Sequence, residues 1–254
     1  MDIQQEIQLQ LNNIEKTHNV TILHAVESGS RAWGFPSPDS DFDVRFIYAH
    51  SKDWYIQLQE KRDVIELPIN EELDISGWDL RKALNLTNKG NAVVQEWLIS
   101  PIVYQTHPST KQLQTLACNA FNPIATFHHY LSTAKNAYAD INTGQKIKLK
   151  RFFYFARAVL SALWIAQKHT MPSIVFAELL DDLPIEDSVR EKVTVLITTK
   201  AAAVESTVIT IDNSIIDFFN SVYESLLDVH PIANDNKTAV SDADFLTLLN
   251  ESFL

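Results

Sequence analysis

The sequence predicts an α+β fold in which strands are confined to the first part of the chain and helices make up the rest. Segments with the composition of strands end near Tyr104. Beyond that point, apolar residues recur at the three- and four-residue steps typical of helices. Glycine is also scarce, with five in 254 residues, yet two glycines stand close together ahead of several aspartates in residues 27–48. We therefore expect two domains, residues 1–105 and residues 106–254.

The first elements alternate between the patterns of helix and strand. Residues 3–18 predict an amphipathic helix, because Ile7, Leu11 and Ile14 recur at steps of three and four residues. Short runs rich in branched and aromatic residues predict strands, two of them clearly at 20–26 and 42–48, and two more weakly at 64–69 and 73–75.

Helical spacing returns after these strands and continues to the end of the sequence. Residues 78–97 predict helix with a break near Gly90, since glycine fits the end of a helix. Further helices are predicted at 107–120, 122–141, 148–169, 186–204 and 213–228. The polar segment 228–242 predicts a loop before a last short helix.

Composition and charge limit the class of protein. With 46% hydrophobic and 21% charged residues, the chain is typical of a soluble globular protein. The opening residues MDIQQEIQLQ lack the apolar core of a secretory signal, and the longest apolar stretch, 152–166, is interrupted by Arg157. The single cysteine, Cys118, suits a reducing compartment. We therefore expect a cytoplasmic protein without a membrane partner.

The net charge of −11 argues against a broad, nonspecific grip on nucleic acid, which requires a positive surface. A local basic patch remains compatible with this charge.

The glycine cluster has the properties of a phosphate-binding turn. Gly29 follows the predicted strand 20–26, and Ser30 can begin a short helix. Backbone N–H groups at such a turn point toward a bound anion, and glycine lets a phosphate approach without a side chain in the way. The hydroxyls of Ser28 and Ser30 add hydrogen-bond donors, and Arg31 either binds phosphate or pairs with Asp39.

The aspartates that follow suggest a metal site. Asp41 and Asp43 are two residues apart on the predicted strand, so both carboxylates point to the same face. Two such acids repel unless a cation neutralises them, and Mg²⁺ typically takes one or two carboxylates together with substrate phosphates. A calcium loop starting at Asp39 is excluded, because its sixth position would be Val44 instead of glycine and its twelfth His50 instead of glutamate. A solvated edge strand and a surface loop are the alternatives.

These residues also carry a resemblance to a known family. Gly29-Ser30, ten intervening residues and the Asp41-Phe42-Asp43 strand resemble the signature of the DNA polymerase beta-like nucleotidyltransferase superfamily. The stretches SGSRAWG (28–34), DSDFDVR (39–45) and GWDLRKAL (77–84) resemble the predicted nucleotidyltransferases called RNA-ligase-associated proteins. The similarity covers most of the first 165 residues.

The resemblance implies a fold and a set of roles. It implies a nucleotidyltransferase-like mixed β-sheet flanked by helices, with residues 1–105 as the catalytic domain and 106–254 as a helical domain. By the same resemblance, Ser30 contacts the nucleotide phosphates, and Asp41 and Asp43 hold Mg²⁺ or Mn²⁺. A third carboxylate, which also contacts the metal and activates the attacking hydroxyl, is expected at Asp74, with Glu66 as the rival and a helix or turn cap as the structural alternative for Asp74.

A second cluster is basic. On a helix, Lys150, Tyr154 and Arg157 share one face, since they are spaced by four and three residues. Such a face could bind a triphosphate or stack a base. A solvated helix start, with Arg157 paired to an acid, is the structural alternative.

Together these features predict a metal-dependent nucleotidyltransferase, an enzyme that moves an NMP group to a hydroxyl acceptor and releases pyrophosphate. ATP is the expected donor, and RNA, a protein or a small molecule could be the acceptor. A catalytically inactive nucleotide sensor, a toxin–antitoxin component that modifies a protein or RNA partner, and a nucleic-acid-binding helical half remain alternatives.

Overall fold

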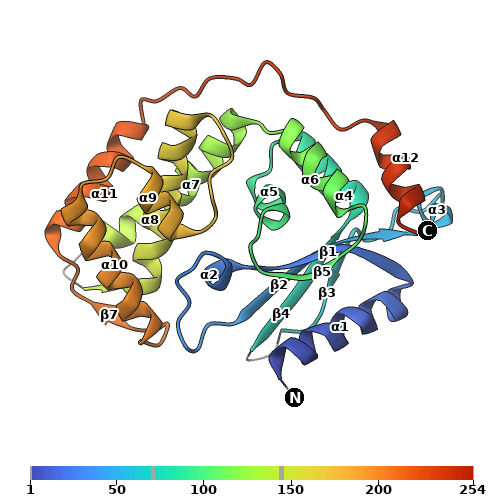
Figure 1. The fold of residues 1–254 in the computed structure, drawn as a ribbon, viewed down its shortest axis with the longest axis horizontal. Helices are drawn as coiled ribbons and strands as arrows, with labels where there is room; N and C mark the ends of the chain where they lie inside the picture. The colour runs from blue at the N-terminus through green and yellow to red at the C-terminus, as the bar shows by residue number, and fades with distance from the viewer. Residues whose placement is uncertain (1, 70–71, 143–145, 254) are drawn as a thin grey trace. The chain divides into compact units, whose positions relative to one another are not determined.

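The computed structural model describes residues 2–69, 72–142 and 146–253, which form two compact units (Figure 1). The first unit comprises three segments of the chain: the residues up to Gly29, Asp41–Phe121, and the residues from Asn236 onward. The second unit comprises Ser30–Ser40 and Asn122–Asp235. These units interleave along the sequence, whereas we expected one break after residue 105. The limits of the functional domains stay a prediction.

The first unit is built on a mixed five-stranded sheet with the order β3-β4-β2-β1-β5. Its strands are β1 (Val20–Ser28), β2 (Phe42–His50), β3 (Val64–Glu66), β4 (Leu73–Asp79) and β5 (Val103–Thr106). The central pair β2 and β4 is parallel, and the other neighbouring pairs are antiparallel. The predicted α+β class and mixed sheet are therefore confirmed.

Helices cover both faces of this sheet. The apolar face of α1 (Ile3–His18) packs Ile7, Leu11 and Ile14 against one face. The other face is covered by α4 (Leu80–Asn88), α5 (Ala92–Leu98), α6 (Thr110–Asn119) and α12 (Asp242–Glu251). Figure 1 shows α1 on one side of the sheet and α4, α5 and α6 on the other. The short α3 (Lys52–Tyr55) follows β2.

An irregularity in β1 determines which of its residues face each layer. The register with β2 shifts between Ile22 and His24, as in a β-bulge. Ile22 and Ala25 therefore lie in the layer with α1, whereas Leu23 and Val26 lie in the opposite layer. Apolar residues of β1 lie on both of its faces because helices cover both sides of the sheet.

The second unit is mainly helical. Its helices are α7 (Pro123–Asn142), α8 (Leu149–Lys168), α9 (Phe176–Asp182), α10 (Asp187–Ala201) and α11 (Asn213–Leu226), and its strands are β6 (Ile147–Lys148) and β7 (Val208–Ile209). Segment 30–40 joins this unit through Phe35, which is fully buried, stacks on Phe153 with centroids 4.9 Å apart and meets Phe176 edge to face. This aromatic cluster anchors a segment that is remote in sequence from the helices.

The predicted elements largely match those observed, and the differences have physical causes. The strand expected at 73–75 continues to Asp79, because its backbone pairs with β2 through Gly77 despite the weak strand preference of glycine. The strand expected at 64–69 ends at Glu66. Strands do not stop near Tyr104, because β6 and β7 pair later, but they have two residues each and leave no pattern in the sequence. The described part of the chain contains no helix with the length and apolar character needed to cross a bilayer.

Gly77 offers a test of the central strand pair. It lies opposite Phe46 in β2, and a Cβ atom added at Gly77 would overlap the Phe46 ring. We expect Gly77→Ala to lower the free energy of unfolding by about 1–3 kcal/mol, since the ring must shift within a packed core. Denaturant unfolding measures this loss. In a Phe46→Leu background the same substitution should cost clearly less, and equal costs in the two backgrounds would contradict the proposed overlap.

Candidate active site

The turn after β1 places Gly29 against the carboxylate of Asp43. Gly29 opens the four-residue helix α2 (Gly29–Ala32) and has a φ of +69°, a conformation that glycine adopts without strain. A Cβ atom at this position would overlap the Oδ2 atom of Asp43. Ser28 is the cross-strand partner of Asp43. Glycine is therefore required here both by backbone conformation and by the close approach of a carboxylate.

Asp43 and Asp74 lie side by side. They are paired in register on the parallel strands β2 and β4, so their side chains extend from the same face of the sheet. Arg45 links them, with its Nη2 atom 3.1 Å from Asp43 Oδ1 and 2.7 Å from Asp74 Oδ2. Its Nη1 atom also donates to the backbone carbonyl of Asp74 at 2.9 Å. A single guanidinium thus offsets the repulsion between two partly buried carboxylates.

A buried glutamate fixes the backbone beside this pair. Glu27 is 1% exposed, and its Oε1 atom accepts a hydrogen bond from the Asp43 backbone N–H at 2.9 Å. The Tyr104 hydroxyl donates to its other carboxylate oxygen. Glu27 and Arg45 were both missed as candidate site residues in the sequence. Arg45 could have been found, since it follows Asp41 and Asp43 at the same two-residue spacing.

The other two predicted carboxylates do not lie on the central strands β2 and β4. Asp41 is exposed and precedes β2 by one residue, so it lies outside the strand on which we had placed it. Glu66 lies on the edge strand β3 opposite Ser76, where it pairs with Arg62. Asp74, one strand nearer to Asp43, is therefore the better-placed candidate for the third carboxylate.

Two carboxylates suit a magnesium ion, which completes its shell with water and phosphate oxygens. Within residues 2–69, 72–142 and 146–253, no three His, Cys, Asp or Glu side chains gather closely enough to hold a metal. The Asp43–Asp74 pair therefore fits Mg²⁺ as a two-ligand site, and its charge is at present offset by Arg45.

Asp79, at the far end of β4, has a structural role. It is 1% exposed, accepts hydrogen bonds from the Tyr55 hydroxyl at 2.7 Å and from the Arg81 backbone at 2.8 Å, and caps α4. Burial raises the pKa of the Asp79 carboxyl, and it also raises the pKa of Tyr55, which the neighbouring carboxylate raises further. The Asp-Leu-Arg motif thus starts a helix.

In the second unit, hydrogen bonds hold the predicted phosphate-binding serine and arginine. The Ser30 hydroxyl donates to Ser40 Oγ at 3.2 Å, and Arg31 donates to the Ser40 carbonyl at 2.6 Å. Ser40 in turn donates to Glu205 at 3.0 Å. The ammonium of Lys200, which is 1% exposed, donates to Ser37 at 2.9 Å, and burial lowers its pKa. Segment 30–40 is thus held by a network of polar contacts.

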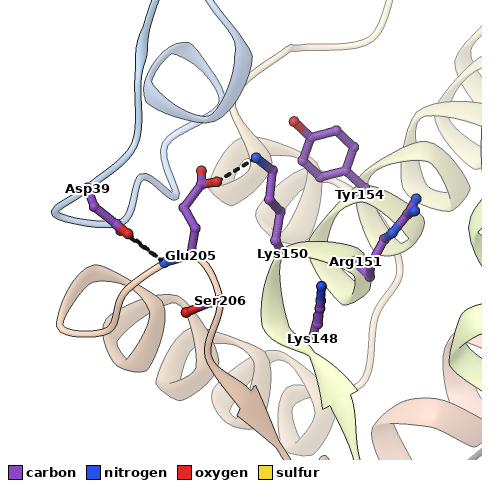
Figure 2. A pocket seen from close by; sticks show the side chains of 7 residues that line it. All are labelled: Asp39, Lys148, Lys150, Arg151, Tyr154, Glu205 and Ser206. Carbon is purple, nitrogen blue, oxygen red and sulfur yellow. Dashed lines mark hydrogen bonds and ion pairs between the residues drawn. The ribbon is translucent and has the colours of Figure 1, made fainter. Parts of the chain in front are cut away.

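The predicted basic face divides into two environments. Lys150 and Tyr154 line a pocket of about 530 Å³ (Figure 2). The other residues of its lining are Asp39, Lys148, Arg151, Glu205 and Ser206. Arg157 is not among these residues, since it is only 6% exposed. Its guanidinium carbon lies 4.2 Å from the centroid of the Trp33 ring, and its Nε atom donates to the Ile174 carbonyl at 3.3 Å. The structure therefore brings Lys150 and Tyr154 together at one cavity and places Arg157 in the core.

Comparisons with known proteins agree with the resemblance seen in the sequence. The sequence model of a family described as the RNA repair pathway DNA polymerase beta family matches residues 3–248. The chain belongs to this family. It is 44% identical over 199 residues to the uncharacterized protein YcgL of Bacillus subtilis (strain 168), a match that covers 78% of this chain and 76% of YcgL.

A nucleotidyltransferase-like protein from Exiguobacterium sibiricum 255-15 is a similar solved structure. Its TM-score is 0.32 at 12% identity, over 87% of this chain and 74% of that one.

By its family, the chain is a nucleotidyltransferase-like protein. The resemblance to the RNA-ligase-associated proteins is confirmed.

Arg45 gives a test of the carboxylate pair. In metal-free buffer, we expect Arg45→Met to lower the free energy of unfolding by about 1–3 kcal/mol, since it leaves two neighbouring carboxylates without their shared donor. Added Mg²⁺ should raise the melting temperature of this variant more than that of the unchanged protein.

Arg62→Met is the matched control, because Arg62 pairs with Glu66 in an exposed ion pair, which contributes at most about 1 kcal/mol. Equal losses of stability and equal responses to Mg²⁺ in the two variants would contradict the role assigned to Arg45.

Proposed function

We propose that the protein is a metal-dependent nucleotidyltransferase that moves an NMP group, AMP from ATP in the first instance, to a hydroxyl acceptor. The observation that carries this proposal is the side-by-side placement of Asp43 and Asp74, with the backbone of Gly29 directly against Asp43. A carboxylate pair beside a glycine turn provides both a metal site and a place for phosphate. Membership of a DNA polymerase beta family supports this reaction class.

The turn after β1 is the proposed phosphate site. Ser28 and Gly29, followed in the chain by Ser30 and Arg31, supply backbone N–H groups, hydroxyls and a guanidinium to the triphosphate. Gly29 itself adds no side chain to this turn, and the adjoining Asp43 carboxylate would contact the phosphate oxygens through a shared metal ion. Ser30 and Arg31 would exchange their present hydrogen bonds with Ser40 for bonds to the nucleotide.

Asp43 and Asp74 would hold Mg²⁺ or Mn²⁺, and Asp41, expected from the sequence as a metal ligand beside Asp43, would have to move toward the pair from its place just ahead of β2. When bound, the metal supplies positive charge to the attacking and leaving oxygens of an in-line displacement. Asp74 orients the acceptor hydroxyl and takes its proton. The hydroxyl oxygen then bonds to the α-phosphorus, the bond to the β-phosphate oxygen breaks, and pyrophosphate leaves.

Arg45 and Glu27 act as positioning residues in this proposal. Arg45 holds the two carboxylates together before substrate arrives, and Glu27 holds the backbone of Asp43 in place. Neither needs to contact the nucleotide. The description of the family as an RNA repair pathway family favours RNA as the acceptor, over a protein or a small molecule.

The acceptor can be found by labelling. We expect the protein, incubated with each labelled NTP and Mg²⁺, to transfer label from ATP into the RNA fraction of a cell extract, with release of pyrophosphate. The Asp43→Asn variant measures the background. Label in the protein or metabolite fraction would identify another acceptor, and no label above background in any fraction would contradict the proposed activity.

Three substitutions test the carboxylates. We expect Asp43→Asn and Asp74→Asn each to lower the rate of pyrophosphate release at least 100-fold, since a metal ligand and a general base each contribute on the order of 10²-fold or more. Glu66→Gln on the edge strand should leave the rate within about twofold. A near-normal rate for Asp74→Asn, together with a large loss for Glu66→Gln, would move the third carboxylate to β3.

A further inference from the structure

The pocket at the start of α8 has the size and lining of a ligand site. Its volume of about 530 Å³ lies within the range usual for small-molecule pockets, roughly 300–1,000 Å³. All of its lining residues belong to the second unit. Lys148, Lys150 and Arg151 supply positive charge, Asp39 and Glu205 supply negative charge, and Tyr154 supplies an aromatic ring (Figure 2). The lining thus combines ionic and aromatic groups in one cavity.

The basic residues of the pocket lie at the N-terminal end of α8, where positive charge is unfavourable. Lys148 precedes α8 as its N-cap residue, Lys150 and Arg151 lie in its first turn, and this turn contains no acidic residue. The N-terminal end of a helix carries partial positive charge, so cations there are unfavourable and anions are favourable. An anionic ligand in the pocket would offset this repulsion.

Glu205 already makes contacts of the kind that a phosphate would make. Its carboxylate lies 2.6 Å from the ammonium of Lys150 and accepts a hydrogen bond from Ser40 Oγ at 3.0 Å. The carboxylate of Asp39 holds the backbone N–H of Glu205, at 2.9 and 3.2 Å. An ammonium and a hydroxyl converging on one anionic group resemble a phosphate-binding arrangement. A phosphate entering the pocket would compete with Glu205 for Lys150.

Tyr154 offers a fixed aromatic surface beside these cations. Its ring meets Trp33 edge to face, with centroids 5.2 Å apart and an interplanar angle of 77°. Trp33 is held in turn by the guanidinium of Arg157. Nucleotide bases stack on such aromatic rings with little preference for sequence. A phosphate group and a base could therefore be bound by neighbouring parts of the pocket.

We propose that this pocket binds one phosphorylated nucleotide of the acceptor, with the phosphate on Lys148, Lys150 and Arg151 and the base or ribose on Tyr154. This inference deepens the proposed function. It rests on that function in one respect, because the bound nucleotide is an acceptor only if the protein transfers an NMP group. Three cations against two carboxylates leave one net positive charge, which matches a phosphate monoester of about −1.5 to −2 better than the larger charge of a triphosphate. The net charge of −11 on the whole chain favours one terminal nucleotide over an extended nucleic-acid backbone.

Direct binding measurements on the full chain test the site without relying on catalysis. The probes are inorganic phosphate, AMP, ATP, and a short single-stranded RNA with a 5′-phosphate, with a 3′-phosphate or with neither. We expect AMP and at least one phosphorylated RNA to bind about tenfold or more tightly than the RNA without a terminal phosphate. Comparison of AMP with the RNAs identifies the source of the nucleotide, and comparison of the two RNA ends identifies the phosphate that is recognised.

Substitutions then assign the binding to this pocket. Lys150→Ala and Arg151→Ala should each weaken binding of the phosphorylated probes about tenfold, because each removes a charged donor. Lys135→Ala changes the net charge equally at an exposed residue of α7 outside the pocket lining, and it should leave binding unchanged. Equal losses in all three variants, or no loss in any, would overturn the proposal.

Substitutions of Glu205 and Tyr154 should change the affinity for AMP in opposite directions. Glu205→Gln removes the competing carboxylate and should tighten binding of AMP several-fold, whereas a structural role for the ion pair alone predicts no gain. Tyr154→Ala should weaken the binding of AMP but leave the binding of inorganic phosphate unchanged, and Tyr154→Phe should retain AMP binding.

The salt dependence of RNA binding is a further test. A plot of the logarithm of the binding constant against the logarithm of the salt concentration should have a slope no steeper than about −2, as expected for at most three phosphate contacts.

Two outcomes separate this inference from the proposed function. Asp43→Asn should abolish transfer and leave phosphate and AMP binding unchanged, so binding can succeed even where transfer fails. Tighter binding of ATP than of AMP, lost in Lys150→Ala, would assign the pocket to the donor nucleotide and overturn its assignment to the acceptor.

Discussion

Two carboxylates held side by side on neighbouring parallel strands set the main electrostatic constraint on the first unit. The register of β2 with β4 fixes the backbones of Asp43 and Asp74 next to each other in the sheet. Their repulsion must be offset, and Arg45 does so from the same strand face as Asp43. Two neighbouring residues accommodate this arrangement. Gly29 leaves room for the Asp43 carboxylate, and the buried Glu27 accepts a hydrogen bond from the Asp43 backbone. The cation proposed for this site would meet two carboxylates that are already held side by side.

The second unit also contains a cluster of like charges that is offset by one residue of opposite charge, but there the cluster is basic and the offsetting residue is acidic. There, basic side chains gather at the start of α8, and Glu205 neutralises Lys150. Through Ser40, the same carboxylate contacts the segment that carries Ser30. Glu205 therefore links the basic pocket to the residues that follow the glycine turn. A single acid is shared by two functional candidates that lie far apart in sequence.

Much of this organisation could be predicted from the sequence, for reasons that individual residues make clear. The strands at 20–26 and 42–48 are rich in branched and aromatic residues, and the Gly29-Ser30 turn with its later aspartates stands out in a chain poor in glycine. Asp74 was a candidate only by resemblance, because its place opposite Asp43 depends on the pairing of strands separated by 22 residues of chain, between His50 and Leu73.

The remaining features depend on tertiary contacts that no local pattern encodes. Arg157 has the same helical spacing as Lys150 and Tyr154, yet it is buried against Trp33, which lies on a distant segment. Glu205 has no neighbouring motif at all. The predicted boundary after residue 105 followed the change from strand to helix patterns, whereas compact packing follows contacts such as that of Phe35 with Phe153 and Phe176.

Segment 30–40 has a consequence for how this chain can be divided or can have arisen. Its residue Phe35 fills the aromatic core of the helical unit, while the last helix, α12, packs Leu248 and Leu249 into the sheet unit. A fragment starting at residue 106 would thus lack one of its own core aromatics and would carry a terminal helix that belongs to the other unit. Neither unit corresponds to a continuous stretch of the gene, so a simple end-to-end fusion of two independently folding ancestors does not account for the arrangement. The helical unit is instead nested in the sheet unit at two places along the chain, with residues 122–235 between α6 and α12 and residues 30–40 between β1 and β2.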